Sequence, residues 1–250
     1  MHEITGVLLT TALAIIAYRF KILSHNGIYL AFVIGIIISL TSGVGWLLIL
    51  LSFVLAGFLS TRFGIEEKRR RKASEGNNGQ RNIKNVFANG LAPLAIAILF
   101  WIHQNFFAGQ AITRTAVSTA IGQNFYFTAY VGAVAAATSD TLASELGSLD
   151  RETRLITNLR KKVKPGSEGG ISLIGELSTF IGGLLIGLIA FFLSGQKNIL
   201  IIAPLAGVLG SHVDSLLGAT LETRGVLSNE EVNIISTLFG SISALIMVFV

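Results

Sequence analysis

The chain has 250 residues, of which 52% are hydrophobic and only 13% are charged, with a mean hydropathy of +0.69. A soluble domain carries about a quarter charged residues, so this composition excludes an ordinary soluble protein and predicts an integral membrane protein. No cysteine is present, which excludes disulfides, thiolate catalysis and cysteine-ligated zinc or iron–sulfur sites.

Apolar segments long enough to enter a membrane recur along the whole chain. A window of roughly 19 residues finds about eight of them, and the first two are short for a bilayer that needs about 20 residues. The last turns of the fifth are polar. Residues 1–250 are therefore predicted to form one all-α integral-membrane domain, a polytopic bundle of transmembrane helices. The predicted spans lie near residues 4–20, 27–41, 44–62, 86–105, 124–146, 171–194, 199–218 and 232–250.

Basic residues determine the predicted orientation of these spans. Of the 19 lysines and arginines, 17 fall on one side of an eight-span arrangement, chiefly in loops near residues 63–85, 147–170 and 219–231. Only Arg114 and Lys197 fall on the other side. Loops rich in lysine and arginine face the cytoplasm, so both termini are predicted to lie outside a cell membrane. This topology and attraction to anionic lipid heads explain the net charge of +5, and nucleic-acid binding is not expected.

Polar residues gather at the cytoplasmic ends of the later spans. Asp140 and Glu145 end the fifth span, Asp214 ends the seventh, and Asn233 begins the eighth. Ionisable groups at such a depth are costly and mark ion, proton or substrate chemistry. Small residues at helical spacing around Asp140 and Asp214 direct both carboxylates into the bundle. A purely structural role, with both aspartates hydrogen-bonded to neighbouring hydroxyls and helix ends, is the alternative.

Two aspartates that face one cytoplasmic pocket suit Mg²⁺. This ion is held by one or two carboxylates plus substrate phosphates, so Asp140 and Asp214 are predicted to be its ligands. Zinc is less suitable, because the chain has no cysteine and only four scattered histidines. His212 lies beside the acids, either as a packing residue or as a general base.

A glycine-rich segment has the composition of a phosphate-binding loop. Residues 164–170, Lys-Pro-Gly-Ser-Glu-Gly-Gly, lead directly into the sixth span. Successive backbone N–H groups of such a loop can form an anion nest, the following helix N-terminus adds its positive end, and Lys164 adds a charge. A flexible linker between two spans is the alternative.

An asparagine-rich segment precedes the fourth span. It runs from residue 77 to residue 89, with Arg81, Asn85 and Asn89 at helical spacing. Asparagine both donates and accepts hydrogen bonds, which suits a ribose, a base edge or a phosphate oxygen. A solvated, capped helix start is the alternative for residues 77–82, but it explains Asn85 and Asn89 poorly.

At these residues the chain resembles a known family of integral membrane proteins, the one that contains plant phytyl-phosphate kinase and animal transmembrane protein 19. The order and spacing of the motifs match from about residue 70 onward. More distantly, the chain is similar to dolichol kinase, phytol kinase and phosphatidate cytidylyltransferase, which use CTP with Mg²⁺. The matching motifs are Arg81-Asn82, residues 86–90, 139–147, 166–170 and 210–220, and Asn229 with Val232-Asn233.

The resemblance implies transfer of the γ-phosphoryl group of CTP to an isoprenoid monophosphate, giving a prenyl diphosphate and CDP. Motif position and the chemistry above predict Asp140, Asp214, Glu145 and Lys164 as catalytic residues, with Glu145 a further ligand or an orienting group. The predicted partners are CTP, an isoprenoid monophosphate and membrane lipid, and the predicted cofactor is Mg²⁺. The residues predicted to bind substrate are Arg81, Asn82, Asn85, Asn89, Ser139, Ser144, Gly166, Ser167, Gly169, Gly170, Ser211, Ser215 and Asn233.

Three other functions remain open. The same acids and loops would serve a cytidylyltransferase that attacks the α-phosphorus of CTP and makes a CDP-lipid. A transporter or scramblase would use the acids as ion or proton sites, although the one-sided distribution of polar groups speaks against it. A non-catalytic assembly subunit is the third. A homo-oligomer is also open, since Gly182, Gly183 and Gly187 suit helix packing within one chain or between two.

Overall fold

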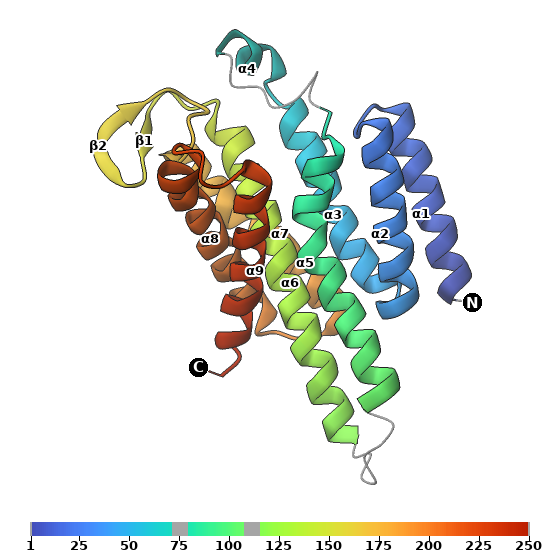
Figure 1. Cartoon of the computed structure of the whole chain (residues 1–250). Coiled ribbons are helices and arrows are strands. Elements are labelled where there is room, and N and C mark those ends of the chain that lie inside the picture. The colour runs from blue at the N-terminus through green and yellow to red at the C-terminus, as the bar shows by residue number, and fades with distance from the viewer. Residues whose placement is uncertain (1, 72–79, 108–115, 250) are drawn as a thin grey trace.

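The computed structural model describes residues 2–71, 80–107 and 116–249, so Arg114 and residues 77–79 lie outside the described ranges. In this part of the chain, eight α-helices of at least 18 residues occupy the positions of the predicted spans (Figure 1). They are α1 (His2–Arg19), α2 (His25–Ser42), α3 (Val44–Arg62), α5 (Ile83–Ile102), α6 (Ala116–Gly147), α7 (Leu173–Ser194), α8 (Ile199–Leu217) and α9 (Asn229–Ile246).

The membrane character of the bundle rests on the apolar helices. Within the described residues, α2, α3, α5, α7 and α8 are the five helices that are both long and apolar enough to cross a membrane, and α1 is apolar but shorter. Figure 1 shows both termini at the end of the bundle opposite the strands and the short helix α4 (Ile65–Arg71). We call the end with the strands and α4 the polar end.

Helix α6 forms the centre of the bundle and contacts α3, α5, α7, α8 and α9. Glycines allow these contacts to be close. A Cβ on Gly132 would lie 2.5 Å from the Cβ of Ala244 in α9, and a Cβ on Gly183 in α7 would lie 2.6 Å from the Cα of Pro204 in α8. Gly182 and Gly187 also pack within the chain, against α6 and α8. The small residues therefore bring backbones together, as is typical of membrane helices.

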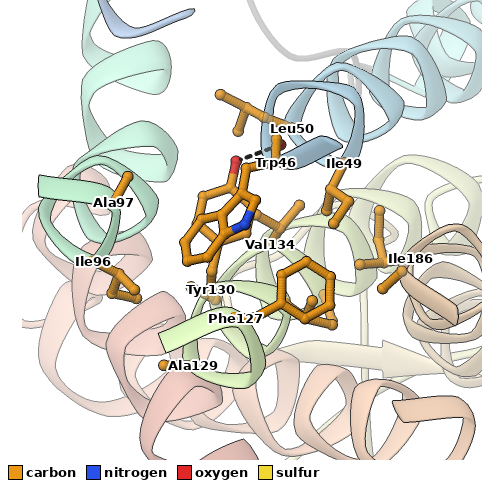
Figure 2. Packing of buried hydrophobic residues seen from close by; sticks show 14 of the residues in the cluster. Trp46, Ile49, Leu50, Ile96, Ala97, Phe127, Ala129, Tyr130, Val134 and Ile186 are labelled. Atoms are coloured by element: carbon orange, nitrogen blue, oxygen red, sulfur yellow. Dashed lines mark hydrogen bonds between the residues drawn. The ribbon is translucent and has the colours of Figure 1, made fainter. Parts of the chain in front are cut away.

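An aromatic cluster fills the bundle between α3, α5 and α6 (Figure 2). The ring of Trp46 lies 4.6 Å from that of Tyr130 and 5.2 Å from that of Phe100, centroid to centroid. The Tyr130 hydroxyl donates a hydrogen bond of 2.8 Å to the carbonyl oxygen of Trp46. This bond satisfies a buried polar group, so the cluster fixes the relative positions of α3 and α6.

The predicted loop 147–170 contains secondary structure that the sequence analysis did not predict. Strands β1 (Thr153–Leu155), β2 (Asn158–Val163) and β3 (Gly170–Ser172) form an antiparallel sheet with the order β2-β1-β3. Strand β3 runs directly into α7, whose first turn is capped by the Ser172 hydroxyl accepting from the Gly175 N–H. The sheet thus anchors the glycine loop between β2 and β3 at the start of α7.

Two other connections at the polar end are helical. The loop 63–85 contains α4, and the loop 219–231 begins within the π-helix η2 (Gly218–Glu222), which continues α8. A second π-helix, η1 (His103–Phe107), continues α5 at the opposite end.

Candidate functional site

A cavity of about 240 Å³ opens at the polar end of the bundle. Its walls come from the ends of α5, α6, α7, α8 and α9, from the glycine loop and from β1 and β3, so they join segments that are far apart in the sequence. We call it the polar pocket. Among the residues predicted to act or bind, the polar pocket is lined by Arg81, Asn85, Asn89, Asp140, Ser144, Glu145, Gly166, Ser167, Gly169, Gly170, Ser211, Asp214, Ser215 and Asn233.

The two aspartates, Asp140 on α6 and Asp214 on α8, lie near each other where the two helices pack together. The Ser211 hydroxyl, one turn before Asp214, donates a hydrogen bond of 3.5 Å to Oδ1 of Asp140. Oδ2 of Asp214 is buried and has no hydrogen-bond partner within the described residues. An unpaired buried carboxylate oxygen is costly, so this atom is arranged for a ligand that supplies positive charge or a proton.

Further carboxylates surround Asp214. Those of Asp140, Glu168 and Glu222 act on it electrostatically, and a Cβ on Gly218 would lie 3.5 Å from Oε2 of Glu168 and 3.7 Å from Oε2 of Glu222. Such a concentration of negative charge repels a nucleotide unless cations intervene.

The donor set fits a hard divalent cation. Asp140 and Asp214 supply carboxylate oxygens, one of them the unpaired Oδ2, and oxygen ligands are those that Mg²⁺ prefers. Among the described residues, no three histidine, aspartate or glutamate side chains are already grouped as a complete metal cage. A site of two carboxylates completed by water and substrate phosphates is the arrangement that Mg²⁺ usually adopts.

Glu145 lines the polar pocket, but both oxygens of its carboxylate contact residues of the neighbouring helices α3 and α4. Oε2 lies 2.6 Å from Nζ of Lys68 in α4, and Oε1 accepts a hydrogen bond of 2.5 Å from the Thr61 hydroxyl in α3. Lys68 is fully buried and also donates to the carbonyl oxygen of Ser60 at 2.6 Å. These contacts make Glu145 a link between α6, α3 and α4, so its geometry favours the orienting role over the ligand role.

Helix α4 holds the end of α6 through a second basic residue. Nη1 of Arg71 donates to the carbonyl oxygens of Leu149 and Asp150 at 2.9 and 2.7 Å. Both carbonyls belong to the turn that follows Gly147, the last residue of α6, so Arg71 fixes α4 to the segment that leaves α6.

The asparagines of α5 divide into a cap and a pocket wall. Asn82 is exposed and caps α5, because its side chain accepts from the Asn85 N–H at 3.0 Å while the Asn85 side chain accepts from the Asn82 N–H. One turn deeper, Nδ2 of Asn89 donates to the Asn85 carbonyl, and its Oδ1 is buried without a hydrogen-bond partner in the described structure. Asn89 therefore offers an acceptor to the polar pocket.

The glycine loop is a pair of turns packed on α8. Gly166 and Gly169 have φ angles of 80° and 68°, which a side chain rarely adopts. The N–H groups of Ser167 and Gly170 donate to the carbonyl oxygens of Lys164 and Ser167, so two amides of the predicted nest are used within the loop.

Two other predicted residues lie away from the polar pocket. Lys164 is exposed, outside the pocket lining. Ser139 is buried between helices, where its hydroxyl donates to the carbonyl oxygen of Thr179 in α7 at 2.7 Å. Its contact joins α6 to α7.

Several lining groups were absent from the predicted site residues, and three of them carry polar side chains of interest. Glu168 belongs to the glycine loop, and Glu176 in α7 lies 3.2 Å from Nε2 of His212. Thr153 in β1 has a buried hydroxyl that lacks a hydrogen-bond partner among the described residues. The position of Glu168 between two predicted glycines was a usable signal, whereas Thr153 reaches the polar pocket only because the sheet forms.

The carboxylate of Asp150, beside the polar pocket, holds the first turn of α7 in place. Asp150 accepts hydrogen bonds from the backbone N–H groups of Arg151 and Ile174, at 2.7 and 3.2 Å. Burial raises the pKa of Asp150, but these backbone donors, together with that of Glu152, outweigh it and hold the pKa below its usual value. The charged form of Asp150 therefore ties the sheet to the helix.

The chain is similar to proteins of an archaeon and of a plant. It is 36% identical to an uncharacterised membrane protein of Methanocaldococcus jannaschii, over 95% of this chain and 90% of that protein. It is 31% identical to protein PGR of Arabidopsis thaliana, over 90% of this chain and 81% of that protein. Identity to protein VTE6, chloroplastic, of the same plant is 26%, over 90% of this chain and 65% of that protein.

No solved structure matches the chain significantly. The family profile described as integral membrane protein DUF92 matches residues 8–241, which include every residue that lines the polar pocket. Because this profile covers most of the chain, and a relative that is 36% identical aligns with 95% of it, the chain belongs to the DUF92 family of integral membrane proteins.

Proposed function

We propose that this protein is a membrane-bound prenyl-phosphate kinase that transfers the γ-phosphoryl group of CTP to an isoprenoid monophosphate. The observation that carries the proposal is the convergence of Asp140, Asp214, Arg81 and Asn89 in one pocket at one end of an apolar bundle. Acids for a phosphate-bound cation, a guanidinium and amide groups are what phosphoryl transfer requires, since it depends on positioning and charge neutralisation.

In the proposed reaction, an oxygen of the acceptor monophosphate attacks the γ-phosphorus of CTP. The bond from that phosphorus to the β–γ bridging oxygen breaks, and CDP leaves with this oxygen. The acceptor phosphate is already ionised near neutral pH, so no side chain has to remove a proton. When bound, Mg²⁺ on Asp140 and Asp214 supplies charge neutralisation for the CTP phosphates. Arg81 balances the acceptor phosphate, and Asn85 and Asn89 orient the substrates.

The resemblance to the family of plant phytyl-phosphate kinase supports this choice of substrates. The polar end is proposed to face the cytoplasm, where CTP is available, because most basic residues lie in its loops. Lys164 is proposed to attract the nucleotide from solution, since its side chain is exposed beside the glycine loop.

The proposal is tested with purified protein, Mg²⁺, γ-labelled CTP and a panel of prenyl monophosphates. Label in a lipid diphosphate with release of CDP supports the kinase. Label in pyrophosphate, together with a CDP-lipid, would identify a cytidylyltransferase instead, and lipid or ion flux without CTP consumption would identify a transporter.

Variants of the two aspartates provide the matched test. Asp140→Asn and Asp214→Asn each keep the side-chain shape and remove a charged oxygen, so kcat is expected to fall at least about 100-fold. Glu152→Gln is the control, because Glu152 is an exposed acid of the same polar end, paired with Lys162 outside the pocket lining. Full activity in both aspartate variants would refute the assignment.

A further inference from the structure

A second cavity, of about 350 Å³, lies between α1, α2, α3 and α5. We call it the apolar groove. Its walls are almost entirely leucine, isoleucine, alanine, phenylalanine and valine side chains. Such walls offer water few hydrogen-bond partners, so the groove is suited to a hydrocarbon.

The apolar groove and the polar pocket meet at two residues, Arg81 and Asn85, which line both. The backbone of Arg81 is fixed there: its N–H donates to the carbonyl oxygen of Ile22, and its carbonyl oxygen accepts from the Ser24 N–H at 2.9 Å. The guanidinium lies over the ring of Phe53, a residue of the groove wall, 5.4 Å from its centroid, so its charge lies where the two cavities meet.

Glycine provides the room for this side chain. A Cβ on Gly57 in α3 would lie 3.1 Å from Cζ of Arg81. A positive charge at the mouth of a hydrocarbon-lined groove is complementary to one kind of molecule, an amphiphile with an anionic head and an apolar tail.

The length of the apolar groove sets how much tail it can take. Its lining extends from Ala17 to Leu9 on α1 and from Leu55 to Leu47 on α3, about 12 Å along each helix at about 1.5 Å per residue. An extended chain advances about 1.1–1.2 Å per bond, so an isoprene unit with four chain bonds covers about 4.5 Å. The groove therefore matches about two to three isoprene units.

We propose that the apolar groove binds the tail of the prenyl monophosphate, with its phosphate at Arg81 and its first two to three isoprene units between α1, α2, α3 and α5. This inference rests on the proposed function for the identity of the head group. Units beyond the third extend past Leu9 and Leu47 into the bilayer, so the site measures the beginning of the chain and tolerates any longer tail.

A matched pair of variants on α1 tests the placement. Ala14 lines the apolar groove about 4.5 Å beyond Ala17, whereas Ala12 is exposed on the lipid side of the same helix. Ala14→Phe is expected to raise KM for C15 and C20 prenyl monophosphates about 5- to 150-fold, the range that overpacking of a filled site produces. KM for CTP stays unchanged, and Ala12→Phe behaves as the parent protein.

A labelling experiment that needs no turnover separates this inference from the kinase proposal. A prenyl monophosphate carrying a photoreactive group on its second isoprene unit is crosslinked to the parent protein in vesicles, and the modified residues are mapped by mass spectrometry. Modification of groove residues that unlabelled prenyl monophosphate suppresses supports the placement, even if no phosphoryl transfer is detected. Modification confined to lipid-facing residues would overturn it. Equal modification by a photoreactive fatty alcohol without a phosphate would also overturn it, because an ordinary hydrocarbon would then be the occupant.

Discussion

Replacing Lys68 by methionine tests the support behind the proposed site. Lys68 is 0% exposed and Glu145 is 4% exposed, with 2.6 Å between Nζ and Oε2. The substitution keeps the side-chain volume but leaves the carboxylate of Glu145 buried without its cation. Removing one partner of a buried ion pair costs about 3–5 kcal/mol, so Lys68→Met is expected to lower the free energy of unfolding by about that amount.

The control uses the same substitution at an exposed pair. Lys162 and Glu152 lie 2.8 Å apart on the sheet, with side chains 62% and 60% exposed, and such pairs contribute about 0–1 kcal/mol. The free energy of unfolding is measured in mixed detergent micelles, where the fold of each variant is followed by circular dichroism. If Lys68→Met costs no more than Lys162→Met, the reasoning about the buried pair is refuted.

A double variant separates support from chemistry. Lys68→Met with Glu145→Leu removes both charges, and a buried ion pair replaced by apolar groups is often neutral in stability. Stability is expected to recover to within about 1 kcal/mol of the parent protein. Recovered phosphoryl transfer would then show that Glu145 serves only to support α6. A stable but inactive double variant would instead favour its role as a further Mg²⁺ ligand.

The following three variants probe other parts of the fold. Gly132→Ala is expected to cost about 1–3 kcal/mol, because the new Cβ would collide with α9, and Gly45→Ala, where nothing lies within 4 Å, is its control in the same unfolding measurement. Tyr130→Phe should cost about 1 kcal/mol through the lost hydrogen bond to Trp46, and an unchanged stability would contradict the role of that bond. The pKa of Asp150 is lower in the folded protein than in the unfolded chain. The charged carboxylate therefore stabilises the fold fully at pH values above the unfolded-state pKa, and this stabilisation is lost as the pH falls through the folded-state pKa. Melting temperatures between pH 6 and pH 3 should show this loss in the parent protein and less of it in Asp150→Asn.

The positions of the helices could be predicted because a membrane makes strong demands on sequence. Apolar runs located the eight long helices of the described structure, seven of them to within about four residues at each end, whereas α6 begins eight residues before the predicted span 124–146. Helical spacing around Asp140 and Asp214 also predicted that both would face the bundle interior, where the polar pocket forms. These are signals within one helix, which a single sequence carries.

The contacts between distant segments could not be predicted. Nothing near Lys68 distinguishes it from the basic residues that follow it, yet it alone in that helix is buried, against a carboxylate 77 residues away. The sheet was missed because β2 is almost entirely exposed, so it has no alternation of apolar and polar residues. Lys164 was selected by composition, but its exposure depends on how the turns of the glycine loop pack on α8.

The shared position of Arg81 has a kinetic consequence for the proposed enzyme. A residue that borders both cavities lets the two substrates arrive by different routes, the nucleotide from water and the lipid sideways from the bilayer. The acceptor then never has to be extracted from the membrane. Turnover should accordingly follow the mole fraction of prenyl monophosphate among the surrounding lipids, and adding inert phospholipid at constant total acceptor should slow the reaction by surface dilution.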